Sequence, residues 1–240
     1  MSDSTAAVGH DHHESTFLNT YVFSTDHKMI GKQFFWMALV MMILGGVLAL
    51  MFRWQLAWPE TSVWGFGWLS EDNDFMPTGI IGPDKYNMMV TMHATVMVFL
   101  VLMPMFSGAF SNFLIPLMIG ARDMAFPLLN MLSFWVAALG ALIMMSGFFV
   151  EGGHAAAGWT AYAPLSIKEE YTGVGMGQTL WALSIFTLTI SSLMGSVNYI
   201  TTIINMRTKG MTWFRLPTTI WALFVVAILS LLALPILGAA

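Results

Sequence analysis

The chain has 240 residues, of which 57% are hydrophobic and only 9% are charged, and its formal net charge is −4. Ordinary soluble domains are about a quarter charged, so this composition excludes a soluble globule and indicates a chain that lies mostly in a membrane. The few basic residues form no cluster, which argues against nucleic acid as a partner. The absence of cysteine excludes disulfides and thiolate metal sites, so a metal or cofactor would need histidine, methionine or oxygen ligands.

Five apolar segments are long enough to cross a membrane as helices, because a span needs about 20 residues. They are predicted at about residues 33–51, 88–118, 127–150, 178–206 and 219–237. The fold class is therefore an all-α membrane protein, with a polar tail at residues 1–25 and a transmembrane bundle at residues 26–240. No secretory signal is recognised, so the first span is expected to stay in the mature protein.

The basic residues predict the orientation of the bundle. Six Lys and Arg lie in the tail and in the loops expected on its side, against three in the loops of the other side. Positive charge favours the cytoplasmic side, so we expect a cytoplasmic N-terminus in a bacterial inner membrane. The chain ends in an apolar sequence after its fifth span, which we interpret as a bundle that further helices complete.

A single histidine, His93, lies within the second predicted span. With the predicted orientation it lies seven residues from the outer end of that helix, which is about 10 Å at 1.5 Å per residue. An ionisable ring at this depth is costly in lipid, and imidazole is a usual ligand of haem iron. It can equally be a neutral ring that is hydrogen-bonded to a neighbouring helix. The spacing leaves both interpretations open.

The fourth span carries small polar side chains at steps of three and four, which place them on one helix face. They are Ser184, Thr187, Ser191, Asn198, Thr202 and Asn205, with Gly195 between them. Such a face lets helices approach and hydrogen-bond, and it can equally hold a file of water molecules that moves protons. Asp123 precedes the third span, with Asn112, Asn130 and Ser133 nearby in sequence, and a carboxylate in this position can collect protons.

The remaining polar residues give weaker signals. The three histidines His10, His12 and His13 are interpreted as part of a solvated tail rather than as a metal site. Glu151 and His154 follow the third span, where water is expected to be close, so we assign them no chemical role. The residues 26–28 at the start of the first helix are expected to be interfacial and structural.

Several longer stretches carry a resemblance to a known family. They are DHKMIG (26–31), ALMFRWQL (49–56), YNMMVTMHATVMVFL (86–100), NFLIPLMIGARDMAFP (112–127), GWTAYAPL (158–165) and SSLMGSVNYITTIINM (191–206). They resemble subunit I of the haem-copper terminal oxidases of the cytochrome c oxidase type, and the resemblance extends from residue 25 to residue 234. It implies the first five helices of a twelve-helix bundle.

The resemblance implies a cofactor and the residues that hold it. His93 matches an axial ligand of a low-spin haem, of the haem a type. Arg53 matches the arginine that binds the formyl group of that haem, and Trp159 matches a tryptophan near its propionates. From position alone, both residues could simply be interfacial. The second axial histidine, the high-spin haem and the copper have their ligands further along the family's sequence, so a longer subunit or a second polypeptide is expected to supply them.

The resemblance also implies a proton-uptake path. Asp123 matches the residue at its mouth, and Asn112 and Asn130 match positions just inside. We assign Ser133, Asn198, Ser191 and Ser192 to the same path, with the two adjacent serines deeper. Arg122 stands where the family commonly has proline, and Met131 replaces one of two adjacent asparagines, so these departures could retune proton uptake.

The expected function is that of part of the catalytic subunit of a respiratory terminal oxidase. Such an enzyme passes electrons from cytochrome c through haem to dioxygen, reduces it to water and translocates protons. The expected partners are the remaining helices of subunit I, a copper-bearing subunit II, subunit III, a cytochrome c-type donor and membrane lipid. The alternatives are a haem-free scaffold or assembly paralogue of the same fold, and a member that oxidises quinol.

Overall fold

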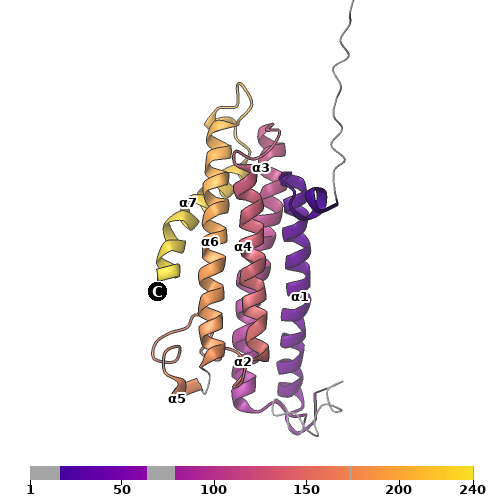
Figure 1. Ribbon diagram of the computed structural model, residues 1–240, viewed down its shortest axis with the longest axis vertical. Coiled ribbons are helices and arrows are strands. Elements are labelled where there is room, and N and C mark those ends of the chain that lie inside the picture. The colour runs from indigo at the N-terminus through magenta and orange to yellow at the C-terminus, as the bar shows by residue number, and fades with distance from the viewer. Residues whose placement is uncertain (1–16, 64–78, 173–174, 240) are drawn as a thin grey trace, which may run out of the picture.

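The structure is a computed structural model that describes residues 17–63, 79–172 and 175–239. The described residues form helices and connecting loops, without strands (Figure 1). Five helices are long and apolar enough to cross a membrane, and they agree in number and order with the five predicted spans. They are α1 (His27–Ala57), a composite helix (Pro83–Ile119), α4 (Pro127–Ser146) with a short 3-10 turn to Phe149, α6 (Met176–Asn205) and α7 (Thr218–Ala239).

The second span is a composite of four helical segments. They are α2 (Pro83–Thr95), two π-helical segments η3 (Val96–Leu102) and η4 (Pro104–Phe110), and α3 (Ser111–Ile119). Pro104 has no N–H group, so the regular ladder cannot continue through it. Near the end of the second π segment, the carbonyl of Phe106 accepts both the backbone N–H and the hydroxyl of Ser111, the latter at 3.0 Å. Such π segments often occur at functional sites.

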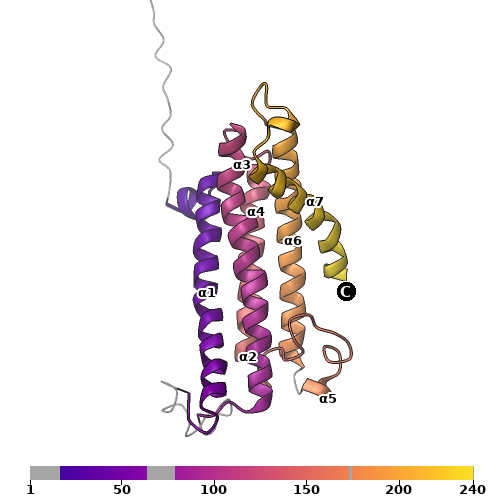
Figure 2. The same cartoon turned by 180° about the vertical axis from the view of Figure 1, so that it is seen from behind.

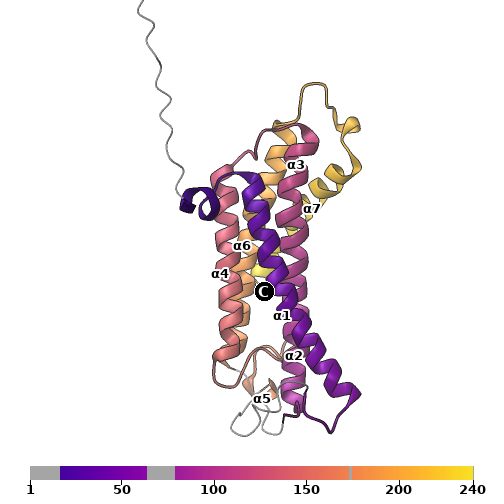
Figure 3. The same ribbon diagram turned by 90° about the vertical axis from the view of Figure 1, so that its right-hand side faces the viewer.

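The helices run roughly along the long axis of the molecule, and α7 is inclined along the outer side of α6 (Figures 1 and 2). α4 and α6 lie side by side in these views. Their close approach depends on Gly140, because a Cβ atom there would lie 2.9 Å from Cγ of Leu188 on α6. α1 crosses the composite helix and diverges from α4 toward one end of the bundle (Figure 3).

The two ends of the bundle carry different groups of residues (Figures 1 and 2). The loop between α3 and α4 and the start of α1 lie at one end, which we call the Asp123 end. The start of α2 and the loop that contains the short helix α5 (Glu169–Thr172) lie at the other, which we call the Trp159 end. The residues predicted to bind haem and those predicted to admit protons therefore belong to opposite ends.

Part of the predicted polar tail is packed against the bundle. Residues Leu18–Val22 form a π-helical turn, η1. The Gln33 side-chain nitrogen donates to the carbonyl of Tyr21 at 2.7 Å, and the Trp135 indole donates to the carbonyl of Val22 at 3.2 Å. The turn is therefore tied to both α1 and α4. Residues 1–16, which include the three tail histidines, lie outside the described residues, as do residues 64–78 in the first loop.

Candidate functional site

His93 is held by a hydrogen bond to the backbone of a neighbouring helix. Its Nδ1 lies 2.8 Å from the carbonyl oxygen of Gly45 on α1, so this nitrogen carries the proton and donates. The contact requires glycine on α1, because a Cβ atom at Gly45 would lie 2.9 Å from Sδ of Met97 and 3.3 Å from Cγ1 of Val96. The hydrogen bond therefore depends on the close packing of α1 against the composite helix.

The second ring nitrogen of His93 is left without a partner among the described residues. The ring is half-buried, and its nearest aromatic neighbour is Phe52, with ring centroids 5.5 Å apart in an edge-to-face arrangement. Histidines that bind metals commonly donate one N–H to a carbonyl, which fixes the tautomer and leaves the other nitrogen as the ligand. This donor set fits a haem iron. The interpretation of a neutral ring bonded to another helix accounts for the Gly45 contact but assigns no role to Nε2.

Arg53 and Trp159 lie at the same end of the bundle as His93. Arg53 is exposed on α1, beside Phe52 in the chain, and forms no hydrogen bond or ion pair with the other described residues. Trp159 is 44% exposed and packs near Phe99 of the composite helix, with ring centroids 6.4 Å apart. The loop before it is tied to the same helix, since the N–H of residue 158 donates to the Thr91 hydroxyl at 3.1 Å.

His154 was expected near water, and the structure corrects this expectation. Its side chain is fully buried. Nε2 lies 2.6 Å from the carbonyl of Met144 near the end of α4, and Nδ1 accepts from the N–H of Ala155 at 2.7 Å. Burial lowers the pKa of His154 to about 4, against an opposing hydrogen bond with Met144. The ring is therefore neutral and caps α4, because the loop folds back over it instead of opening to solvent.

Asp123 lies at the opposite end, in the loop between α3 and α4. It is half-buried, and its Oδ1 accepts from the N–H of Met124 at 2.7 Å. The rest of this loop is held against α6 by two bonds. Oδ1 of the Asn198 side chain accepts from the N–H of Phe126 at 2.9 Å, and the Thr202 hydroxyl accepts from the N–H of residue 125 at 2.9 Å. The polar face of α6 thus holds the carboxylate-bearing loop in place.

Asn112 and Asn130, predicted to lie just inside the mouth, are in direct contact. The Asn130 amide nitrogen donates to Oδ1 of Asn112 at 2.6 Å, and the Asn112 nitrogen donates to the carbonyl of Gly108 at 2.6 Å. Both side chains are fully buried, and Oδ1 of Asn130 has no partner. We call this amide pair the neck.

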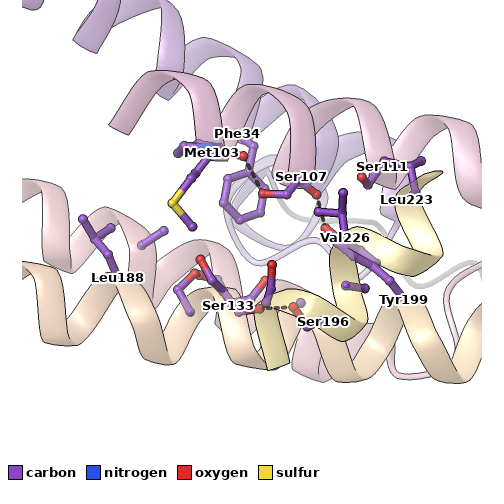
Figure 4. A pocket seen from close by; sticks show the side chains of 18 of the residues that line it. Phe34, Met103, Ser107, Ser111, Ser133, Leu188, Ser196, Tyr199, Leu223 and Val226 are labelled. Atoms are coloured by element: carbon purple, nitrogen blue, oxygen red, sulfur yellow. Dashed lines mark hydrogen bonds between the residues drawn. The ribbon is translucent and has the colours of Figure 1, made fainter. Parts of the chain in front are cut away.

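A small cavity lies beyond the neck, between the composite helix, α4, α6 and α7 (Figure 4). Its volume is about 50 Å³, which holds a few water molecules, because one water needs roughly 10–15 Å³ by this measure. Its polar wall consists of Ser107, Ser111, Ser133, Ser191, Ser192, Ser196 and Tyr199. Three of these residues were predicted for the proton path, and the structure brings them together around one space.

Three hydroxyl groups of this wall donate to backbone carbonyls. Ser133 donates to the carbonyl of Asn130 at 2.7 Å, Ser191 donates to the carbonyl of Ser133 at 2.6 Å, and Ser196 donates to that of Ser192 at 2.9 Å. Each of these three hydroxyl groups donates to the backbone, so the three oxygens remain as acceptors. Acceptors in the wall favour water molecules that donate, and they favour a protonated water over an anion.

The polar face of α6 also packs helices together, which was one of its two predicted interpretations. Ser184 donates to the carbonyl of Gly140 on α4 at 2.6 Å, and Thr187 donates to its own helix at 2.8 Å. Asn205 is exposed. Ser191 serves both purposes, since it bonds to α4 and lines the cavity.

Sequence reasoning missed Tyr199, Ser107 and Ser196. Tyr199 stands eight residues after Ser191, so its helical position already placed it on the polar face. An aromatic ring in an apolar helix ordinarily indicates packing, and only the fold shows where its hydroxyl points. Ser107 lies on the π segment η4, whose register a regular helical period does not predict.

Comparison with known proteins finds one family and several relatives that this chain is similar to. The family described as cytochrome c and quinol oxidase polypeptide I matches residues 29–240. The chain is 39% identical over 226 residues to the alternative cytochrome c oxidase subunit 1 of Bradyrhizobium diazoefficiens, covering 94% of this chain and 36% of that protein. It is 40% identical over 220 residues to cytochrome c oxidase subunit 1 of Thermostichus vulcanus, covering 91% and 36%.

The cytochrome c oxidase subunit 1 of Synechocystis sp. is 36% identical over 230 residues, covering 96% of this chain and 37% of that protein. The chain therefore spans little more than a third of the length of these curated relatives.

Proposed function

Because the chain belongs to the cytochrome c and quinol oxidase polypeptide I family, we propose that it forms part of the catalytic subunit of a respiratory oxidase. The enzyme passes electrons from cytochrome c through haem to dioxygen, reduces it to water and translocates protons. The contribution of this chain is one ligand of a low-spin haem and the entrance of a proton-uptake path. The names of the relatives, cytochrome c oxidase subunit 1, support cytochrome c rather than quinol as the donor.

The observation that carries this proposal is the arrangement of His93. One ring nitrogen is fixed on the Gly45 carbonyl, and the other, in a half-buried ring among apolar side chains, has no partner in the described parts of the chain. His93 would hold the iron of a low-spin haem as an axial ligand, Arg53 would bind the formyl substituent of a haem a, and Trp159 would contact its propionates. When bound, the haem relays single electrons. The Gly45 hydrogen bond holds the imidazole orientation and raises its basicity toward the iron.

The proton path begins at Asp123 and continues through the neck to the cavity lined by Ser133, Ser191 and Ser192. The half-buried carboxylate exchanges protons with water at the surface. The neck controls passage, because amide groups do not relay protons at neutral pH and water must enter between Asn112 and Asn130. The serine oxygens then accept from water molecules in the cavity. Asn198 holds the loop of Asp123 through the backbone of residue 126.

The other parts of the enzyme lie outside this chain. The second axial histidine, the high-spin haem and the copper are held by the remaining helices of subunit I, in the same or a second polypeptide. A copper-bearing subunit II, subunit III and a cytochrome c-type donor complete the assembly. The bundle lies in a bacterial inner membrane with the Asp123 end in the cytoplasm, which the excess of basic residues at that end supports.

Optical spectroscopy of the assembled oxidase tests the haem assignment. His93→Ala is expected to abolish the low-spin haem band in reduced-minus-oxidised spectra, because an iron with one axial ligand removed does not stay low-spin. His154→Gln is the matched control, since it replaces a buried imidazole at the same end of the bundle and is expected to keep the band. A low-spin band that survives in His93→Ala would contradict the assignment and favour a haem-free scaffold role for this chain.

Proton uptake tests the path. Asp123→Asn removes the titratable group and is expected to slow proton uptake during turnover by at least about tenfold, measured with a pH-indicator dye in the assembled oxidase. Uptake at the unaltered rate would contradict the path. The intact mass of this polypeptide in the native complex then decides whether the missing histidines belong to the same chain.

A further inference from the structure

Tyr199 occupies a position between the neck and the cavity. It is 6% exposed, lies on α6 next in sequence to Asn198, and forms part of the cavity wall (Figure 4). Its ring also lies against Gly195, where a Cβ atom would approach its Cε2 to 3.6 Å. The side chain is therefore packed in one place, and its hydroxyl is the only part of it that can take part in polar contacts.

The hydroxyl of Tyr199 makes two hydrogen bonds of opposite direction. It donates to the carbonyl of Ser107 on the π segment η4, and it accepts from the amide nitrogen of Asn112 at 3.3 Å. The carbonyl of Ser107 can only accept, so the hydroxyl proton is committed to it and the oxygen must act as the acceptor. The orientation of this hydroxyl is therefore determined by the backbone.

This contact is one of three that fix which way the Asn112 amide faces. Its NH₂ group has two acceptors, the carbonyl of Gly108 and the hydroxyl of Tyr199, and its carbonyl oxygen faces the NH₂ group of Asn130. If the Asn112 amide were reversed, its NH₂ group would meet that of Asn130 and its oxygen would meet the Gly108 carbonyl. Both contacts would be repulsive.

We propose that Tyr199 is a positioning residue of the proton path, which holds Asn112 in the orientation that closes the neck against Asn130. The proposal rests on the proposed function. Tyr199 does not itself carry protons in this arrangement, because its proton is donated to a backbone carbonyl that cannot pass it on. Its role is to keep the amide pair together until water enters.

Replacement by phenylalanine removes this restraint with little change in shape. In Tyr199→Phe, the Ser107 carbonyl loses the bond from the hydroxyl and one N–H of Asn112 loses an acceptor, and a buried polar group that lacks a partner recruits water. The neck is then hydrated more often. A net hydrogen bond corresponds to about a two- to tenfold change in an equilibrium, so proton uptake through the neck is expected to become about two- to tenfold faster.

The first measurement compares Tyr199→Phe with Tyr162→Phe in the assembled oxidase. Tyr162 is 74% exposed at the Trp159 end, so its variant loses the same atom far from the neck and is expected to take up protons at the original rate. Uptake is followed with a pH-indicator dye after the reaction with dioxygen is started by a flash. An unchanged or slower rate in Tyr199→Phe would overturn the proposal.

A second measurement shows whether Tyr199 acts through Asn112. A high-resolution structure of the Tyr199→Phe oxidase is expected to contain an ordered water or a reoriented amide at Asn112, and an unaltered pair without water would overturn the proposal. In the Asn112→Ala background there is no amide to hold, so adding Tyr199→Phe is expected to change the uptake rate by less than about twofold. The full effect retained in that background would count against the proposal.

The outcomes separate this inference from the proposed function. If Asp123→Asn slows uptake and Tyr199→Phe leaves it unchanged, the path stands and the positioning role of Tyr199 is wrong. If neither variant changes uptake, the path itself is wrong.

Discussion

Two imidazoles at the Trp159 end are both bonded to a backbone carbonyl, yet they are used differently. His93, where α1 meets the composite helix, bonds through one nitrogen and is half-buried. His154, in the loop after α4, bonds through both nitrogens and is fully buried. The bonds of His154 are complete within the chain, whereas one nitrogen of His93 has no partner among the residues that the structure describes.

The difference teaches how to separate a structural histidine from a candidate ligand. A buried ring whose two nitrogens both have protein partners has no capacity left for a metal. A ring with one nitrogen fixed on a carbonyl is oriented, and its free nitrogen is available. The position of each histidine along the sequence does not distinguish the two cases, because only the folded loop shows how His154 is enclosed.

The largest effect on stability is expected from a substitution where the loop around His154 contacts α6. A Cβ atom at Gly177 would lie 2.1 Å from the carbonyl oxygen of Gly153 and 2.9 Å from Cα of His154. Both are backbone atoms, so they cannot move aside without moving the loop. Gly177→Ala is therefore expected to lower the free energy of unfolding by about 3 kcal/mol or more, measured by chemical denaturation in mild detergent.

Gly46→Ala is the control for this prediction, because a Cβ atom at Gly46 on α1 meets nothing within 4 Å. A glycine in a helix interior is less favourable than alanine, so this variant is expected to be neutral or slightly stabilising. Equal stability of the two alanine variants would show that the loop is not packed against α6 as described.

Removing the His154 ring is expected to have the next largest effect. His154→Ala leaves the Met144 carbonyl and the Ala155 N–H without their side-chain partner. The expected loss is about 2–3 kcal/mol in the free energy of unfolding, because buried polar groups without partners are costly. The low-spin haem band of the assembled oxidase is expected to persist. If His154→Ala lost this band while His93→Ala kept it, the two histidines would have been given the wrong roles.

A substitution at the contact that orients His93 is expected to cost less stability. Gly45→Val places a branched side chain against Met97 and Val96, which moves α1 away and lengthens the hydrogen bond from His93 to the carbonyl of residue 45. Overpacking of this kind costs about 1–2 kcal/mol, since the Met97 side chain is flexible. We also expect a shift in the position of the low-spin haem band, which would report the altered orientation of the ligand.

Gly46→Val is the matched control here, as it adds the same side chain one residue along α1 where space is open. It is expected to leave the band unchanged. A shift of equal size in both variants would mean that the band responds to α1 in general and not to the His93 hydrogen bond.

The fold was predictable from the sequence to the extent that lipid restricts it. A membrane helix must satisfy its own backbone, so long apolar runs predicted the five helices in order. The same rule does not predict η3 and η4, because a π-helical turn satisfies the backbone within the helix as an α-helical turn does. The packing of Leu18–Val22 depends on Gln33 and Trp135, which no local pattern connects to the tail.

The candidate site was predictable in part for a similar reason. The polar face of α6 is periodic, so its members could be found by spacing, and a carboxylate between two spans is conspicuous. The neck and the burial of His154 depend on contacts between segments far apart in the chain. Asn112 and Asn130 lie on different helices, and His154 is enclosed by α2 and α6 as well as by its own loop.

The smallest expected effect is the change of protein stability with pH, which also compares the two imidazole regions. Burial lowers the pKa of His154 to about 4 in the folded protein, against 6.5 for an ordinary histidine. The charged groups that flank it are Glu151, which is exposed, and Lys85, whose ammonium lies against Gly153. Between about pH 6.5 and pH 4 the unfolded chain therefore binds a proton at this residue that the folded chain does not bind.

Stability from this source is fully present above the unfolded pKa and is lost as the pH falls from there through the folded pKa. Between pH 7.5 and pH 5.5 the expected loss from His154 is about 1 kcal/mol in the free energy of unfolding. His154→Gln keeps an amide that can donate to the Met144 carbonyl but does not titrate, so its stability is expected to fall by about 1 kcal/mol less over the same range. Identical pH dependence in the two proteins would mean that His154 is reached by water in the folded state, and the distinction from His93 would then rest on the hydrogen bonds alone.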